Sequence, residues 1–388
     1  MDLKQFQCEL KTLVIFHRIL EDKTVQLVLK TIDDSQYYCQ LCASIYDQGA
    51  NLSDIIYKMV MNDENIYVLK KAENKSIPGV MEQSLKRELN ILQKLCDLKS
   101  EEFSLGMNIE YPTWENTSYD LVKDYEKRII DLPKKGYGIF AKYYVFGINS
   151  QGLFPIKHPD AQSLKDMTGY EQQRSLLIKN TLALLQGMKA NNALLYGDAG
   201  TGKSSTIKAV VNEYHDQGLR LIEVKKKQIA LLPSIIETIS NNPLKFIIFI
   251  DDLSFSSNDD DYIALKNILE GSTTSNKNNI VIYATSNRRH FMKENFSDRA
   301  GDELHRNDTI QETMSLAARF GLTITFQKPG ANLYLDIVKQ YAKEYGLELS
   351  DDELKVKAEA FAIRNNGRSA RTAKQFVEYE KINQSILD

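Results

Sequence analysis

The chain has 388 residues, of which 43% are hydrophobic and 26% are charged, and this composition is typical of a folded globular protein. Its 49 basic and 52 acidic residues give a net charge of −3, which argues against a wholly basic nucleic-acid coat and leaves open only a local basic patch. Because no run of about 18 apolar residues occurs and Met1-Asp2-Leu3-Lys4 does not begin a signal peptide, we expect a cytoplasmic protein without a membrane span.

Two loop-rich stretches predict the domain boundaries. Ser150–Asp160 contains glycine and proline residues, and Pro329-Gly330 forms a second break. We therefore predict a mostly helical N-terminal domain over residues 1–150, an α/β domain over 151–330 and a helical domain over 331–388.

The N-terminal domain places apolar residues at three- and four-residue spacings, which predict amphipathic helices. Within it, Cys39 and Cys42 form a C-x-x-C pair without a second pair or a histidine cluster nearby, so we interpret them as two reduced thiols on a partly buried helix. Its frequent tyrosines fit ordinary helix packing, while a partner surface or stacking on nucleobases stays open. A strand is predicted within Gly136–Gly147, over the apolar residues Ile139–Phe146. The predicted helices are Leu10–Leu20, Tyr37–Tyr46, Leu52–Met61 and Met81–Leu98.

A glycine-rich loop follows a short apolar segment with strand character, Ala193–Tyr196, and precedes a helix start. The loop matches G-x-x-x-x-G-K-[ST], whose backbone N–H groups surround phosphates while the helix N-terminus adds partial positive charge. We predict that Lys203 reaches the β- and γ-phosphates of a nucleoside triphosphate and that the Ser204 hydroxyl binds Mg²⁺. The predicted phosphate-binding residues are Gly197, Asp198, Ala199, Gly200, Thr201, Gly202, Lys203, Ser204 and Ser205.

Two further apolar strands end in polar residues. Phe246–Ile250 is followed by Asp251 and Asp252, and the strand predicted at Asn279–Asn287 has Asn287 as its last residue. Ligands bind at the carboxyl ends of the strands in open α/β sheets. We predict that Asp251 holds Mg²⁺, that Asp252 orients or deprotonates an attacking water, and that Asn287 reaches this water or the γ-phosphate.

The rest of the chain alternates strands and helices. Lys225–Lys227 fits a solvated loop, although contact with a phosphate backbone stays open. Ser297–Asp308 is predicted as a charged surface loop. In the C-terminal domain, Ser350 and Glu353 match a capping box at the start of a helix. The remaining predicted elements are the strands Leu219–Val224 and Leu322–Phe326 and the helices Glu171–Lys189, Ile229–Ser240 and Gln311–Phe320.

Residues from about 160 to 388 resemble a AAA+ ATPase. The phosphate loop, Asp251-Asp252, Asn287, Arg319 and Arg368 follow one another in the order of that family. The segment Leu-Ala-Ala-Arg-Phe-Gly-Leu-Thr around Arg319, and the one that begins Ile-Asp-Asp-Leu, resemble those of DnaA-type initiators, and the core resembles helicase loaders as well. Nearly the whole chain resembles a bacterial family of single-AAA+ ATP-binding proteins classed as a domain of unknown function.

This resemblance implies an α/β fold with a five-stranded parallel sheet, helices on both faces, a C-terminal helical lid and a mostly helical N-terminal domain. It implies ATP and Mg²⁺ as ligands, with adenine held against Gly169 and Tyr170. Arg368 would be the sensor arginine of the lid, and Arg371 on the same helix face is the alternative. Arg319 would act as an arginine finger toward an adjacent subunit, which implies a homo-oligomer, whereas an ion pair within its own domain is the alternative.

Two departures from the family pattern bear on function. Most of the family has glutamate where this chain has Asp252, whose side chain is one methylene shorter, so we expect slow hydrolysis. The segment Lys225–Leu232 lacks the aromatic–aliphatic–glycine pattern of a pore loop, which argues against the threading of proteins.

We therefore predict Mg²⁺-dependent hydrolysis of ATP at subunit interfaces, with Lys203, Asp252, Asn287 and Arg319 as catalytic residues. Hydrolysis would drive a conformational switch or the remodelling of a protein partner, for which the N-terminal domain would be the adaptor. A low-turnover ATP sensor and a nucleic-acid-directed accessory similar to initiators or helicase loaders remain as alternatives. A P-loop kinase fits less well because of the sensor arginines.

Overall fold

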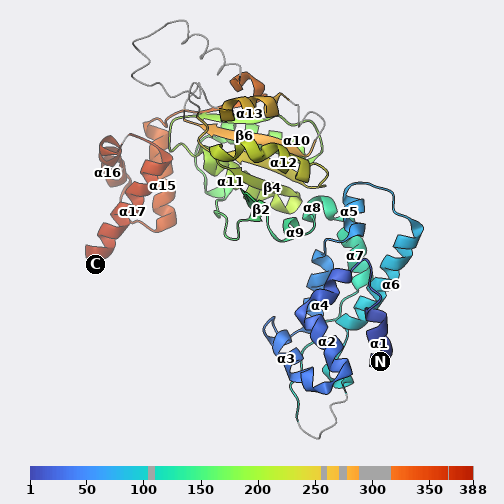
Figure 1. Ribbon diagram of the computed structural model, residues 1–388. Coiled ribbons are helices and arrows are strands. Elements are labelled where there is room, and N and C mark those ends of the chain that lie inside the picture. The colour runs from blue at the N-terminus through green and yellow to red at the C-terminus, as the bar shows by residue number, and fades with distance from the viewer. Residues whose placement is uncertain (104–109, 255–259, 271–277, 288–315, 366, 388) are drawn as a thin grey trace. The chain divides into compact units, whose positions relative to one another are not determined.

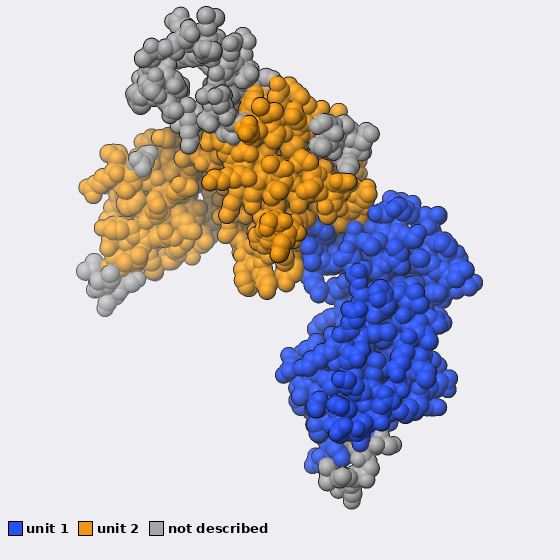
Figure 2. Space-filling view, viewed as in Figure 1, with its two compact units in different colours: residues 1–142 blue, residues 143–388 orange. Residues whose placement is uncertain are grey.

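The protein consists of two compact units, residues 1–142 and 143–388, which Figure 2 colours separately. The predicted division into three domains stays a prediction. The predicted loop Ser297–Asp308 lies outside the described residues, as do residues 311–315 of the helix predicted after it. The computed structural model (Figure 1) describes residues 1–103, 110–254, 260–270, 278–287, 316–365 and 367–387.

The N-terminal unit is built from helices whose apolar faces meet in one core. The helices predicted at Tyr37–Tyr46, Leu52–Met61 and Met81–Leu98 are confirmed to within a few residues. Cys39 is exposed and Cys42 is buried on the same helix, and both are free thiols. The helices are α1 Leu3–Leu10, α2 Lys23–Asp33, α3 Tyr38–Tyr46, α4 Leu52–Asn62, α5 Ile66–Ala72, α6 Gly79–Cys96, α7 Leu121–Ile130, α8 Leu132–Lys135 and α9 Ile139–Lys142.

The helix predicted at Leu10–Leu20 is wrong, because α1 ends at Leu10 and only a short 3-10 helix follows, at His17–Glu21. The cause is Glu88 of α6, whose fully buried carboxylate accepts hydrogen bonds from three successive backbone N–H groups of this segment. Backbone donors that point at a side chain cannot also continue a helical ladder. The N–O distances are 3.0, 2.9 and 3.1 Å for Val14, Ile15 and Phe16.

The strand predicted at Ile139–Phe146 is wrong in its first half, where the short helix α9 forms and ends at Lys142. Strand β1 begins only at Val145. Gly136 and Gly138 lie just ahead of α9 with left-handed φ angles of 68° and 55°. A short apolar run does not distinguish a buried helix from a strand by periodicity, so the sequence favoured the wrong element here.

The second unit contains one sheet, in which each pair of neighbouring strands is parallel except β1 and β2. The implied count of five strands is wrong, because the described residues form a sheet of seven. The hairpin β1–β2 adds the extra strands, and β1 pairs with β4 through Val145 and Leu221. The strands are β1 Val145–Asn149, β2 Gly152–Pro155, β3 Ala193–Gly197, β4 Leu219–Val224, β5 Lys245–Ile250, β6 Ile280–Ser286 and β7 Leu322–Phe326, in the order β2-β1-β4-β5-β6-β3-β7.

Both faces of the central strand β5 are buried. Ile247 and Phe249 pack on one face with residues of the helices α10, Glu171–Leu185, and α11, Lys203–Tyr214. The alternate residues of β5 point to the opposite face and are equally buried. This explains the uninterrupted apolar sequence of the strand, and the helices α12, Leu232–Ile239, and α13, Asp260–Leu269, complete the α/β part.

The C-terminal residues form a separate small bundle of helices beside the sheet (Figure 1). Its helices are α15 Ala331–Tyr345, α16 Asp351–Arg364 and α17 Ala370–Leu387. The predicted capping box of α16 is confirmed, because Ser350 and Glu353 bond each other's backbone N–H groups. Among the helices that the structure describes, none is long and apolar enough to cross a membrane.

We predict that Glu88→Gln lowers the free energy of unfolding of the N-terminal unit by about 2 kcal/mol, because a buried amide group cannot accept all three backbone hydrogen bonds. Trp114 is the only tryptophan of the chain and is buried in this unit, so its fluorescence during urea unfolding of the intact protein reports on the unit selectively. Glu126→Gln, at an exposed position of α7, is the matched control, and equal midpoints for the two variants would contradict the prediction.

Candidate functional site

The glycine-rich loop begins where β3 meets its neighbour β7. Gly197 has a φ of 137°, and a Cβ atom at this position would lie 1.9 Å from the carbonyl oxygen of Phe326. Because that neighbour is backbone and cannot move aside, only glycine fits. Gly200 and Gly202 also have positive φ, at 76° and 89°, and the helix α11 starts directly after the loop, at Lys203. The predicted strand, loop and helix are therefore present in this order.

Lys203 lies at the centre of the site with 6% of its surface exposed. Its ammonium donates hydrogen bonds to the carbonyl oxygens of Gly197 and Asp198, at 2.9 and 2.7 Å, and to Oδ1 of Asn287, at 3.0 Å. Burial lowers the pKa of Lys203, and the nearby carboxylates, Asp198 foremost, oppose this shift. The lysine therefore links the phosphate-loop pattern of β3 to the polar end of β6.

The carboxylates after β5 join the same network. The hydroxyl of Ser204 donates to Oδ1 of Asp251 at 2.6 Å. The side-chain amide of Asn287 donates to Oδ1 of Asp252 at 2.8 Å. Asp252 has a φ of 50°, a left-handed conformation that is rare for residues other than glycine. The structure thus brings the predicted Ser204, Asp251, Asp252 and Asn287 together at the carboxyl ends of three neighbouring strands.

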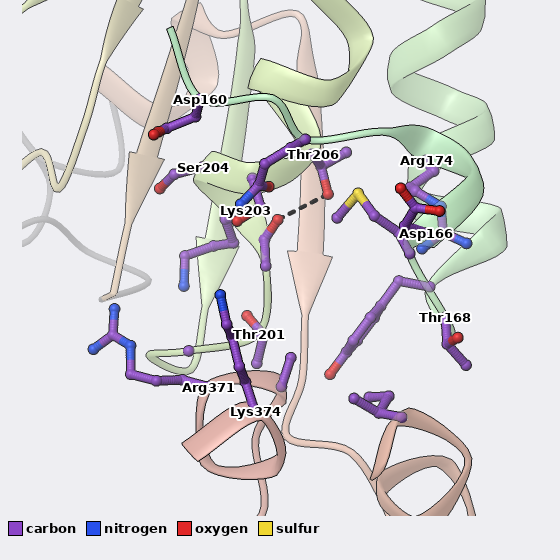
Figure 3. Close-up of a pocket in the computed structure, with 18 of the residues that line it drawn as sticks. Asp160, Asp166, Thr168, Arg174, Thr201, Lys203, Ser204, Thr206, Arg371 and Lys374 are labelled. Carbon is purple, nitrogen blue, oxygen red and sulfur yellow. Dashed lines mark hydrogen bonds between the residues drawn. The ribbon is translucent and has the colours of Figure 1, made fainter. Parts of the chain in front are cut away.

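The C-terminal helices close the site from the opposite side. The backbone N–H of Arg371 donates to the carbonyl oxygen of Gly200 at 3.2 Å, so the last helix touches the glycine loop directly. Figure 3 shows Arg371 and Lys374 on this helix, across the cavity from Lys203 and Ser204. Arg368 does not line the cavity; its Nε donates to both carboxylate oxygens of Glu359 at 3.0 Å.

A cavity of about 750 Å³ lies between the glycine loop, the segment before α10 and the helices α15 and α17. Gly197, Asp198, Gly169, Arg368 and Arg319 are predicted site residues that do not line it. The predicted residues that do line it are Tyr170, Ala199, Gly200, Thr201, Gly202, Lys203, Ser204, Ser205, Asp251, Asp252, Asn287 and Arg371.

Tyr170 lines the cavity and connects the loop before α10 to the segment after β7. Its hydroxyl donates to the carbonyl oxygen of Gln327 at 2.6 Å, its ring packs against Phe326 at a centroid distance of 5.2 Å, and burial raises its pKa to about 12. The carbonyl oxygen of Gly169 accepts a hydrogen bond from the guanidinium of Arg174. The loop before α10 is therefore held in place. Tyr170 lines the cavity, whereas Gly169 does not and instead accepts the hydrogen bond from Arg174.

Arg319 lies in the helical residues 316–319 and outside the cavity lining. Its Nε donates to Oε1 of Glu270 at 2.8 Å, and a quarter of its side chain is exposed. This pair lowers the pKa of the Glu270 carboxyl. The structure thus shows the ion pair within the same chain that the sequence left as an alternative to the arginine finger.

Sequence reasoning missed several residues of the cavity. Lys374 is three residues after Arg371, and this helical spacing could have found it. Thr285 is at the end of β6, two residues before Asn287, where its position at a strand end was the available signal. Nothing in the local sequence marked the remaining residues, which include Asp160, Asp166, Thr168 and Arg174.

The arrangement is able to bind polyphosphate and a divalent cation. Backbone N–H groups at the start of α11, the ammonium of Lys203 and the two cations of α17 face one cavity. A hydroxyl and a carboxylate beside them supply the oxygen ligands that Mg²⁺ prefers. Asp252 and Asn287 form an acceptor and amide pair that can orient a water molecule.

A family model described as "Protein of unknown function (DUF815)" matches residues 141–383. None of the curated proteins matches the chain. Among solved structures, RuvB of Thermotoga maritima, titled a Holliday junction branch migration motor, is similar over 56% of this chain and 63% of its own, at 16% identity and a TM-score of 0.39.

Two further solved structures are similar over a comparable part of the chain. AMPPCP-bound DnaA from Aquifex aeolicus covers 57% of this chain and 65% of its own, at 20% identity and a TM-score of 0.40. A structure titled as a DNA replication initiation factor covers 58% and 66%, at 19% identity and a TM-score of 0.40. The chain thus spans less than two thirds of the length of each of these proteins.

Proposed function

The chain belongs to the family of proteins of unknown function named DUF815, and we propose that it is a Mg²⁺-dependent ATPase of the AAA+ type. One observation carries this proposal. Lys203 and Ser204 begin helix α11, Asp251, Asp252 and Asn287 follow the strands β5 and β6, and all five form one continuous hydrogen-bonded network at a cavity. A cation, metal ligands and a water-orienting pair side by side are what the hydrolysis of a nucleoside triphosphate requires.

The donor set fits Mg²⁺, because Ser204 and Asp251 offer oxygen ligands from adjacent elements and already share a hydrogen bond. When bound, Mg²⁺ supplies positive charge that offsets the negative charge of the phosphates. Lys203 would exchange its loop carbonyl acceptors for oxygens of the β- and γ-phosphates. Asp252, oriented by Asn287, would hold a water molecule and accept its proton as the water attacks the γ-phosphate.

We propose that the base of ATP lies beside Tyr170 in the cavity, between the loop before α10 and helix α15. Tyr170 is fixed there by its hydrogen bond to Gln327 and by its packing on Phe326. Ile337 and Tyr341 of α15 supply apolar surface on the other side. Aromatic and aliphatic side chains are typical of the walls of small-molecule sites.

Arg371 is the better candidate than Arg368 for the arginine that senses the γ-phosphate. Arg371 lines the cavity and its backbone bonds the glycine loop, whereas Arg368 pairs with Glu359. Because Gly200 is bonded directly to the last helix, a change in the loop on phosphate binding or release is passed on to the C-terminal helices. This contact supports a conformational switch as the output of the ATPase cycle.

We further propose that the active form is a homo-oligomer, in which Arg319 leaves Glu270 and reaches the γ-phosphate of a neighbouring subunit. Its partial exposure and its place outside its own cavity support this role. The N-terminal unit would then bind a protein partner. A low-turnover ATP sensor is the second candidate, and the short side chain and left-handed backbone of Asp252 favour it. The proposal of a nucleic-acid-directed accessory rests on the family resemblance alone.

We predict that Lys203→Ala weakens the binding of ATP at least about 100-fold, because the phosphates lose a charge-assisted partner. Asp252→Asn should bind ATP with unchanged affinity and lose hydrolysis by roughly 10²–10⁴-fold, because the base is removed and the binding groups stay. Equilibrium binding of a fluorescent ATP analogue and release of inorganic phosphate measure the two effects. Unchanged hydrolysis in Asp252→Asn would remove the proposed role of this carboxylate.

We predict that Arg371→Ala lowers kcat/KM for ATP by roughly 10–100-fold, because a charged group that faces the phosphates is lost. Arg368→Ala should instead lower the melting temperature, because it breaks the ion pair with Glu359 of α16. Steady-state kinetics and thermal unfolding separate the two effects. A larger kinetic effect for Arg368→Ala would return the sensor role to that residue.

We predict that a mixture of Arg319→Ala and Asp252→Asn proteins regains hydrolysis that neither variant shows alone. In a mixed oligomer, the intact catalytic site of one variant meets the intact Arg319 of the other. Phosphate release is measured across mixing ratios, and assembly is followed by light scattering with ATP and Mg²⁺. Absence of recovery in assembled mixtures would show that Arg319 acts only within its own chain.

A further inference from the structure

We propose that Thr285 is a positioning residue that holds the carboxylates of Asp251 and Asp252 in their working arrangement. This inference rests on the proposed ATPase function and adds to it a residue that acts through the two aspartates. Thr285 is the next to last residue of β6, and only 1% of its surface is exposed. It is therefore placed by the sheet itself, and not by a surface loop.

The hydroxyl of Thr285 donates one hydrogen bond and accepts another. It donates to Oδ1 of Asp251 at 2.5 Å and accepts from the backbone N–H of Asp252 at 2.9 Å. The carbonyl oxygen of Thr285 also accepts from the backbone N–H of Leu253, at 2.7 Å. One residue thus binds three successive residues beyond the end of β5, where the ladder between β5 and β6 has already stopped.

These contacts hold a backbone that would otherwise relax. Asp252 has a φ of 50°, which a residue with a side chain adopts only where its surroundings compel it. Thr285 accepts hydrogen bonds from the N–H groups of both peptides that flank the Cα of Asp252, and these bonds hold the turn. Because the turn points the Asp252 side chain toward Asn287, the hydroxyl acts on the water-orienting pair through the backbone.

The same hydroxyl orients the proposed metal ligand. Two hydroxyl groups, from Ser204 and Thr285, and the backbone N–H of Asp252 converge on Oδ1 of Asp251. Donors fixed from separate elements set the plane of the carboxylate before a metal binds. Second-layer hydrogen bonds of this kind tune the affinity and geometry of metal ligands.

The test uses the full-length chain with three substitutions at this position. Thr285→Val has nearly the same shape but neither donates nor accepts, Thr285→Ala removes the hydroxyl with less bulk, and Thr285→Ser keeps the hydroxyl. The matched control is Ser286→Ala, which removes the next hydroxyl of β6, bonded to the carbonyl oxygen of Leu253 at 2.9 Å instead of to a carboxylate. Each protein is checked for folding by circular dichroism, and binding of a fluorescent ATP analogue, kcat and the Mg²⁺ concentration for half activation are measured.

We expect Thr285→Val and Thr285→Ala to keep the affinity for the ATP analogue, to lose roughly 10–100-fold in kcat and to need several-fold more Mg²⁺. Thr285→Ser and Ser286→Ala should stay within about twofold of the wild type in kcat and in the Mg²⁺ requirement, because the contacts to the carboxylates remain. A purely structural role would lower the melting temperature without moving kcat or the Mg²⁺ requirement.

Several results would overturn the inference. Wild-type kcat and Mg²⁺ requirement in folded Thr285→Val would show that the hydroxyl does not position the aspartates. Failure of both hydroxyl-free variants to fold, with Thr285→Ser folded, would assign the hydroxyl to the fold instead. An inactive wild-type protein that binds no ATP would refute the proposed function, which is a result distinct from either of these.

Discussion

The positive charge of Lys203 is held with only 6% of the residue exposed, and the site depends on how this charge is satisfied. A buried ammonium is tolerated only with good acceptors around it, and here they come from the glycine loop and from Asn287. These contacts tie the end of β3 to the end of β6. They also explain how the site responds to a ligand, because phosphate oxygens can replace the loop carbonyls as acceptors.

The aspartates that follow β5 are held in place by hydrogen bonds to two hydroxyl groups. Ser204 and Thr285 both donate to Asp251, and Thr285 also holds the backbone of Asp252. The left-handed backbone conformation of Asp252 and its short side chain hold the proposed base in one place, from which its carboxylate extends only a short distance into the cavity. In our proposal this geometry makes the ATPase cycle slow, and the hydrogen bond from Arg371 to Gly200 gives the C-terminal helices a direct contact with the glycine loop.

The N-terminal unit uses polar groups for a different purpose. The buried carboxylate of Glu88 accepts hydrogen bonds from three backbone N–H groups that would otherwise bond within a helix. These bonds keep helix α1 from continuing past Leu10 and hold the segment before the next short helix. The residues of the candidate site line a cavity of the second unit. In our proposal the N-terminal unit binds a protein partner.

The sequence by itself determined what depends on neighbours along the chain. The spacing of glycines around Lys203, the polar ends of β5 and β6 and the capping box of α16 follow from local backbone rules, and the structure has all of them. Only the tertiary structure decided the pairing of the hairpin strand β1 with β4, the placing of Arg371 instead of Arg368 at the cavity, and the pairing of Arg319 with Glu270. Two of these features join residues far apart in sequence. The third depends on where α17 begins, because Arg368 precedes this helix and Arg371 lies within it, and periodicity carries no information about either.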